Sequence, residues 1–402
     1  MGFGKKAKPI TIGSSMAWFN IAIVSFSTFF ALLGIMDLCF FKNRLGIGES
    51  FQKGVKTIGV LVLTMAGMIS LAPMISFVNQ KTLGPLFTKM GMDPSIPLTT
   101  FLPIDMGGYH AATLTTDDVP MSLATGIVYA SMSGVTFLFI LPTISTFLKE
   151  EDLPTFGRGL LIGLWGIPIG TLIGGCMLGI DSVKMLYNLI FPCVFFTILF
   201  ILLLLFPKGT LHGFKIISKI IEIISLLAFG ITLVRDLVLI PIGKETGFDA
   251  MGLPFFRYLT PLSEGIQISG NIGLILCGLY PFLTLLLRLL DRPLNKLARR
   301  VHGTKEGLMG PLLSATNLLM TYDVFHQMAK KEQVLNAAFA VGASYALCDH
   351  VAFAIAEAPT AVLPMMVGKL VAGFLGLGIA YLLESIREKK NTKPVPKPQQ
   401  DI

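Results

Sequence analysis

Runs of about 20 apolar residues recur along this 402-residue chain, and they constrain its fold more than any other feature. A helix needs about 20 apolar residues to cross the hydrocarbon core of a bilayer. Shorter apolar pieces near 97–112 and 307–320 are weaker candidates, so the expected total is about 10–11 transmembrane helices. The clear spans are expected at 17–40, 55–79, 121–147, 159–180, 185–206, 216–240, 266–290, 334–356 and 361–383.

The composition agrees with a membrane protein. Only 14% of the residues are charged and the mean hydropathy is +0.73, whereas a soluble domain carries about 25% charged residues. A transmembrane barrel would need short alternating segments, but these runs are continuous. We therefore expect an all-helical, multi-pass protein of the cell membrane. Nucleic-acid binding is excluded, because it would need a basic face on a soluble domain.

Basic residues suggest how the chain is oriented. The densest basic loop is 288–307, and short loops rich in lysine and arginine stay in the cytoplasm. The basic start is followed by a long apolar run without a cleavage site, which predicts an anchoring first helix with its N-terminus inside. Segments 1–16 and 385–402 are expected to be cytoplasmic tails, the second of them disordered. Four further residues fit no single orientation: Lys42, Arg44, Lys330 and Lys331.

The two halves of the chain resemble each other. "FQKGVKTIGVLVLTMAG" at 51–67 and "LSEGIQISGNIGLILCG" at 262–278 carry glycines at the same spacings. Two further matches follow in the same order, 119–137 on 333–353 and 167–175 on 363–373. We therefore expect a membrane domain at 17–384 that contains an internal repeat. Its parts are copy one at 17–181, a linking helix at 185–206 and copy two at 215–384.

Duplications of this kind are typical of transporters, in which discontinuous helices from two repeats enclose a site near the bilayer midplane. The candidates are 97–112 and 307–327, each short and interrupted by proline or glycine. Irregular backbone at membrane depth is tolerated only beside protein or a wet cavity. Whether the repeats are inverted or parallel is left open. The expected helix breaks are at Pro103, Gly107, Gly108, Gly310 and Pro311.

Ionisable residues inside the apolar runs are candidates for function, because each costs about 2.5–3.5 kcal/mol on insertion scales. Asp105 and Asp349 lead, and two carboxylates favour a small cationic cargo, with Tyr280 or another aromatic ring facing the ammonium. Helix capping or a salt bridge is the alternative for Asp105, and pairing with Lys369 is the alternative for Asp349. The expected substrate-binding residues are Asp105, Tyr109, Asn317, Asp349, His350 and Phe353, with Lys369 and Glu357 for coupling or ion pairing.

Other patterns are assigned more ordinary roles. Gly166, Gly170 and Gly174 share one helix ridge, as do Gly368 and Ala372, and small ridges let helices approach closely. The five cysteines show no metal-binding pattern, so neither metal nor cofactor is expected.

Two other classes of function were weighed. An intramembrane aspartyl protease would use Asp323 and Asp349, but residues 346–349 read Ala-Leu-Cys-Asp where that class has Gly-x-Gly-Asp. A channel would more typically show rings of charge from symmetric subunits. No nucleotide loop or catalytic triad is present either, so an enzyme is not expected.

Four segments, "IDMGGYHAA", "LCGLYPFL", "ALCDHVAFAIA" and "LPMMVGKLVAGF", together resemble the ethanolamine utilisation protein EutH family over roughly 17–384. The resemblance implies transport of ethanolamine, as the ammonium ion, across the bacterial inner membrane to cytoplasmic catabolic enzymes. Alternating access around a midplane carboxylate site is the expected mechanism. A channel, or a transporter of choline or another small amine with proton coupling, stays open, as does homo-oligomer assembly. Glu357 departs from the neutral residue expected there.

Overall fold

The protein is built from α-helices, as the apolar runs predict. The computed structural model describes residues 14–246, 249, 252–253, 255–301 and 303–391, and no strand occurs among them. In this part of the chain, eight helical segments are long and apolar enough to cross a membrane. The predicted all-helical, multi-pass fold class is therefore confirmed. Most of the predicted tail at 1–16 and part of the tail at 385–402 lie outside the described residues.

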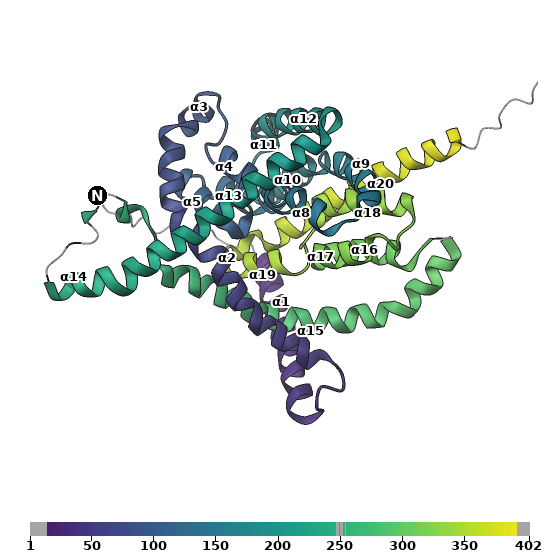
Figure 1. The fold of residues 1–402 in the computed structure, drawn as a ribbon, viewed down its shortest axis with the longest axis horizontal. Helices are drawn as coiled ribbons and strands as arrows, with labels where there is room; N and C mark the ends of the chain where they lie inside the picture. The colour runs from purple at the N-terminus through teal and green to yellow at the C-terminus, as the bar shows by residue number, and fades with distance from the viewer. Residues whose placement is uncertain (1–13, 247–248, 250–251, 254, 302, 392–402) are drawn as a thin grey trace, which may run out of the picture.

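The long helices form the body seen in Figure 1, from which α14 projects at the left and the C-terminal end of α20 at the upper right. The eight segments contain α1 (Ser14–Phe40); α2 (Ile47–Lys81); α6 (Val119–Leu123), α7 (Ser133–Val135) and α8 (Leu141–Phe147); α9 (Leu153–Gly163) and α10 (Gly166–Met177); α11 (Ser182–Asn188) and α12 (Ile190–Leu205); α13 (Pro207–Val234) and α14 (Ile240–Thr246); α15 (Leu262–Val301); and α20 (Val362–Asn391).

The span predicted at 334–356 is not one continuous helix. It is divided into α18 (Lys330–Ala343) and α19 (Asp349–Glu357). Between them, Tyr345 adopts a left-handed conformation with φ 62°, which is uncommon for a residue with a side chain. The amides of Tyr345 and Leu347 donate to the carbonyls of Ser314 and Ala315 at 2.9 and 2.8 Å. Because these amides bond to a neighbouring segment, they are not available to continue the helix.

The first discontinuous segment is a hairpin that enters and leaves the body at the same end. Its arms are α4 (Ile96–Phe101) and α5 (Tyr109–Thr115), with an irregular turn between them. Asn79 donates to the carbonyl of Pro94 at 2.8 Å, and Gln80 donates to the carbonyl of Leu114 at 2.8 Å. Two consecutive residues at the end of α2 thus hold both feet of the first hairpin.

The second discontinuous segment is built in the same way. Its arms are α16 (Lys305–Thr316) and α17 (Leu318–Phe325). The Thr304 amide donates to the Glu332 carboxylate at 2.7 Å, and Gln333 donates to the carbonyl of Phe325 at 3.0 Å. Two consecutive residues at the start of α18 hold both feet of the second hairpin.

The two hairpins enter from opposite faces of the membrane body. The backbone of Gly54 packs against Cys277, and that of Gly265 packs against Ala66, so α2 and α15 are antiparallel neighbours. Their C-terminal ends therefore point to opposite faces. Because the first hairpin follows α2 and the second follows α15, the two hairpins enter the body from opposite faces.

Basic residues gather on the face that holds the feet of the second hairpin. Lys330 pairs with Asp152 at 2.8 Å, and Lys331 pairs with Glu388 at 2.8 Å. Arg288 donates to the carbonyl of Leu45 in the α1–α2 loop. These contacts place Lys42, Arg44, Lys330 and Lys331 on the face that carries the basic end of α15, so the expectation that they fit no single orientation is wrong.

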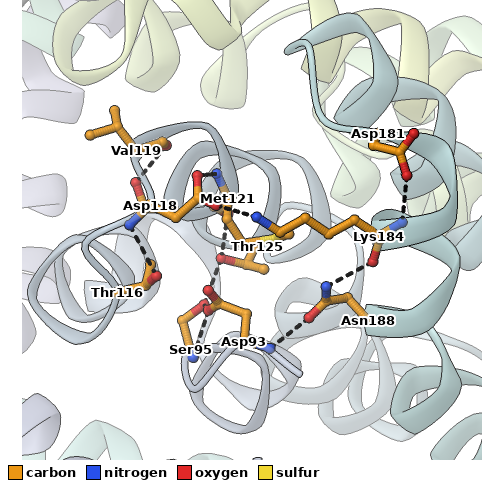
Figure 2. A network of polar contacts seen from close by, with 11 residues as sticks. Asp93, Ser95, Thr116, Asp118, Val119, Met121, Thr125, Asp181, Lys184 and Asn188 are labelled. Carbon is orange, nitrogen blue, oxygen red and sulfur yellow. Dashed lines mark hydrogen bonds and ion pairs between the residues drawn. The ribbon is translucent and has the colours of Figure 1, made fainter. Parts of the chain in front are cut away.

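The opposite face has a polar network that closes the base of the first hairpin (Figure 2). Lys184 at the start of α11 pairs with Asp118 at 2.5 Å. The amide of Asp93 donates to Asn188 at 2.6 Å. The first described turns of α1 also lie here, because Asn20 donates to the carbonyl of Pro359, just before α20, at 2.6 Å. The first described turns of α1 and the basic end of α15 therefore lie on opposite faces of the helical body.

Several helix contacts occur twice, with the two halves of the chain exchanged. Gly67 of α2 packs against the carbonyl of Ser225 in α13, and Gly278 of α15 packs against the carbonyl of Ser27 in α1. The hydroxyl of Ser225 donates to the carbonyl of Thr64 at 3.2 Å, and that of Ser27 donates to Ile275 at 2.7 Å.

The predicted ridges of small residues provide a further contact of this kind. Gly170 of α10 and Gly368 of α20 face each other's backbone, which confirms the close helix approach expected from their spacing. On either side of this crossing, Gly166 packs against Ala372, and Gly174 packs against the carbonyl of Pro364. The two helices cross antiparallel, as α2 and α15 do.

Candidate functional site

The tip of the first hairpin carries Asp105 in a turn that needs both of its glycines. Gly107 has a φ of 83°, and a side chain at Gly108 would meet the carbonyls of Leu102 and Pro103. The Gly108 amide donates to the carbonyl of Pro103 at 3.0 Å. The predicted break at Pro103, Gly107 and Gly108 is therefore found, and it presents Asp105, half-buried, in the interior.

The tip of the second hairpin is Asn317, and not the predicted Gly310 and Pro311, which lie inside α16. A proline leaves the carbonyl four residues earlier without its helical donor. Here Asn336 donates to that carbonyl, of Gly307, at 2.9 Å, so the helix continues through Pro311. The chain becomes extended at Asn317, whose side chain accepts the amide of Leu319 at 3.0 Å and caps α17.

Each hairpin tip is bound to an interruption in a neighbouring helical segment. The hydroxyl of Ser133 donates to the carbonyl of Thr100 in the first hairpin at 2.8 Å, beside the turn at 130–132. In the second half, the interruption at 344–348 bonds the carbonyls of Ser314 and Ala315. In each half of the chain, a hairpin is therefore bonded to an irregular segment of a neighbouring helix.

Asp349 is the first residue of α19 and faces this interior region. Its carboxylate accepts the hydroxyl of Tyr280 at 3.2 Å, and the positive end of the α19 dipole favours a negative charge there. The segment α19 contacts the tip of the first hairpin, and Asp105 is close enough for its charge to act on Asp349. The structure therefore brings together the two carboxylates that the sequence singled out.

Neither Asp105 nor Asp349 forms an ion pair within the described residues. Lys369, the predicted partner of Asp349, lies fully buried in α20 and donates instead to the carbonyl of Ser131 at 2.5 Å. Its charge acts on Asp105. Lys53, whose ammonium is 5.4 Å from the centre of the Tyr280 ring, is the cation that acts on Asp349.

The other predicted residues form an aromatic and polar cluster beside the first hairpin. The rings of Tyr109 and Phe353 meet edge to face with centroids 6.2 Å apart. Glu357 does not join the two aspartates, because its carboxylate lies 3.5 Å from Nε2 of His110. His350 is buried against the Tyr345 ring, and its Nδ1 has no hydrogen-bond partner in the described structure.

Sequence reasoning missed Lys53, Ser131 and Tyr345. Lys53 lies near the start of a long apolar helix, where a lysine is usually a surface residue. Ser131 contributes its backbone carbonyl, which residue type does not reveal. One signal was available: the small and polar run "ASMSG" at 130–134 matches the second interruption in the proposed repeat. No group of three or more metal-ligating side chains was found in the described part of the chain.

Together, the spanning helices and the two opposed hairpins define a multi-pass membrane protein with discontinuous helical segments in its interior. Comparison with known families identifies which membrane protein family the chain resembles. The family model described as "Ethanolamine utilisation protein, EutH" matches residues 19–383, and the chain belongs to this family.

Several relatives match over most of the chain. A protein of Listeria monocytogenes named "Probable ethanolamine permease EutH" is 31% identical over 92% of this chain and 96% of its own length. A protein of Escherichia coli with the same name is 31% identical over 88% and 90%, respectively. "Uncharacterized protein YxeR" of Bacillus subtilis is 30% identical over 94% and 98%. No solved structure matches the chain significantly.

Proposed function

We propose that the protein carries ethanolamine, as the ammonium ion, across the cell membrane and that the carboxylate of Asp349 binds the ammonium group. The names of the relatives support ethanolamine as the substrate. The observation that carries the site assignment is that α19, which begins at Asp349, contacts the hairpin tip that carries Asp105, and that neither aspartate forms an ion pair in the described residues.

The surroundings favour different roles for the two aspartates. The positive charge of the buried Lys369 acts on Asp105 and partly offsets the negative charge of that carboxylate. Asp349 is bonded by the neutral hydroxyl of Tyr280 and keeps acceptor capacity for a cation. We assign the ammonium to Asp349 and the substrate hydroxyl to the free amide nitrogen of Asn317 or to Nδ1 of His350. Asp105 and Lys369 then form the pair through which binding is coupled to hairpin movement.

The mechanism we propose is alternating access by inverted repeats. The contacts that occur twice, Gly67 with Ser225 and Gly278 with Ser27, support a duplication whose copies run antiparallel. The two hairpins enter from opposite faces, so each can gate the route to one face. We assign the basic face to the cytoplasm. The start of α1 then lies outside and the end of α20 lies inside.

The test is uptake of radiolabelled ethanolamine by proteoliposomes that contain the purified protein. We expect saturable uptake that choline inhibits weakly, and loss of uptake in Asp349→Asn. Asp323→Asn is the matched control, because Asp323 is an exposed carboxylate on α17 outside the interior cluster. Flux that rises linearly with substrate would favour a channel. Normal uptake by Asp349→Asn would remove that residue from the site. Comparison with and without a pH gradient tests proton coupling.

A further inference from the structure

A groove of about 510 Å³ lies between α8, α9, α12 and α13, away from the aspartates. Its volume is within the range of ligand pockets, roughly 300–1,000 Å³. No residue of the candidate substrate site lines it. The walls are mainly apolar and include Leu141, Ile144, Leu153, Leu160, Leu161 and Leu203.

Three charged residues line the groove: Glu150, Arg158 and Lys208. Glu150 and Lys208 are exposed, and neither forms an ion pair in the described structure. Arg158 lies 3.7 Å from Glu384, but its Nε is buried without a hydrogen-bond partner. A buried donor that lacks an acceptor is costly, so an acceptor from a ligand would stabilise this position.

The groove has the orientation of a membrane lipid. Glu150 and Lys208 stand at the starts of two membrane spans, Glu150–Met177 and Pro207–Thr246, and hence near the membrane boundary. Within α9, Leu161 lies about 12 Å beyond Leu153, at a rise of about 1.5 Å per helical residue. Glu150 and Lys208 are thus at headgroup level on the basic face, Arg158 lies deeper in α9, and the apolar walls extend into the hydrocarbon region.

We propose that this groove binds phosphatidylethanolamine from the membrane. One acyl chain lies along the leucines, Arg158 and Lys208 hold the phosphate, and the carboxylate of Glu150 accepts hydrogen bonds from the headgroup ammonium. Basic pockets between membrane helices bind lipid phosphates, and two cations beside one carboxylate complement a zwitterion. Phosphatidylcholine offers no N–H to Glu150. Phosphatidylglycerol has no ammonium group, so the carboxylate of Glu150 would have no cation to bind.

The first test is native mass spectrometry of the delipidated full-length protein, incubated with the three phospholipids carrying identical acyl chains. We expect phosphatidylethanolamine to be retained at least fivefold more than the other two. The double variant Arg158→Gln/Lys208→Gln loses this retention, whereas Lys215→Gln, an exposed lysine of α13 outside the groove, keeps it. Glu150→Gln abolishes the preference over phosphatidylglycerol. Equal retention of all three lipids, or a preference for phosphatidylglycerol, overturns the proposal.

A second variant fills the groove without removing a charge. Gly157 lines the groove, and a side chain added there meets no atom within 4 Å. Gly157→Leu should therefore fold normally and displace the lipid. Gly213→Leu is the control, since Gly213 of α13 also has open space but does not line the groove. Undiminished retention in Gly157→Leu contradicts the site. Because lipid mass is the readout, this outcome is independent of whether the aspartates bind ethanolamine.

Discussion

The ammonium group of Lys369 lies 2.5 Å from the carbonyl oxygen of Ser131, at the interruption of a helical segment in the first half of the chain. Lysine is rarely fully buried unless its charge is offset. Here the carbonyl of Ser131 accepts a hydrogen bond from Nζ, and the carboxylate of Asp105 is close enough for its charge to act on Lys369. A side chain from the second half thus joins a hairpin and a broken helix of the first half, and the interaction can be tested directly.

Lys369→Met should lower ethanolamine uptake at least tenfold and lower the melting temperature. Lys369 is the cation whose charge acts on Asp105, so its removal leaves that half-buried carboxylate without compensation. Combining it with Asp105→Asn should restore much of the melting temperature but not uptake, since both charges are then absent. Thermal unfolding and uptake of the single and double variants check this. If the double variant is no more stable than Lys369→Met, the two residues are not coupled.

Tyr280→Phe should reduce kcat/KM for uptake about tenfold or more and leave folding unchanged. The substitution removes the hydroxyl that bonds Asp349 at 3.2 Å, and hydrogen bonds to charged groups contribute about 1.5–3 kcal/mol. Tyr187→Phe is a suitable control, because Tyr187 is an exposed tyrosine of α11 outside the site. Initial rates over a range of ethanolamine concentrations separate an effect on KM from one on kcat. Unchanged kinetics would show that Tyr280 does not orient the carboxylate.

Asp105→Asn should abolish uptake at pH 6 while the protein still inserts into the membrane. Asparagine preserves the size of the side chain but removes the charge that faces Lys369 and Asp349. Uptake in proteoliposomes, with membrane insertion monitored by immunoblotting, is the measurement. Near-normal uptake would leave Asp105 with only a structural role in the hairpin turn.

The contribution of the protein to ethanolamine uptake by cells should be greatest in acid medium. As the pH falls, the neutral fraction of ethanolamine falls, so less of it diffuses through the lipid unaided. The difference in uptake between cells with and without the protein is therefore expected to grow from pH 8 to pH 6. An equal benefit at both pH values would count against the ammonium ion as the transported form.

The proposed internal repeat predicts paired responses to glycine substitution. Gly67→Ala and Gly278→Ala should both lower the melting temperature, because each new methyl group would meet a serine carbonyl of the neighbouring helix. Gly59→Ala and Gly270→Ala are matched controls on the same two helices, with open space around each added methyl group. They should be neutral or stabilising by up to about 1 kcal/mol. If only one of Gly67 and Gly278 proves sensitive, the two halves are not equivalent.

Much of the fold could be predicted from the sequence, because membrane spans depend on the length and hydropathy of a run. The division of 334–356 could not, since the bonds that end α18 come from Ser314 and Ala315 in a segment distant in sequence. The break at Asn317 was missed for a similar reason. Pro311 usually breaks a helix, but a side chain from α18 replaces the missing hydrogen bond.

Part of the candidate site could likewise be predicted from the sequence, and part of it could not. Asp105 and Asp349 could be identified because carboxylates are costly in apolar runs. Their different surroundings could not, because Ser131 contributes a backbone carbonyl, and Lys53 and Tyr280 come from two other helices. Likewise, the pairing of Glu357 with His110 depends on the packing of α19 against the first hairpin.

The entry of the hairpins from opposite faces has a consequence for how the chain is inserted during synthesis. A body with one such element at each face has a similar outline when turned over, so its shape gives the bilayer little reason to prefer one orientation. That choice then depends on the few lysines and arginines in the short loops of one face. Moving those charges to the other face should yield molecules inserted upside down yet correctly packed.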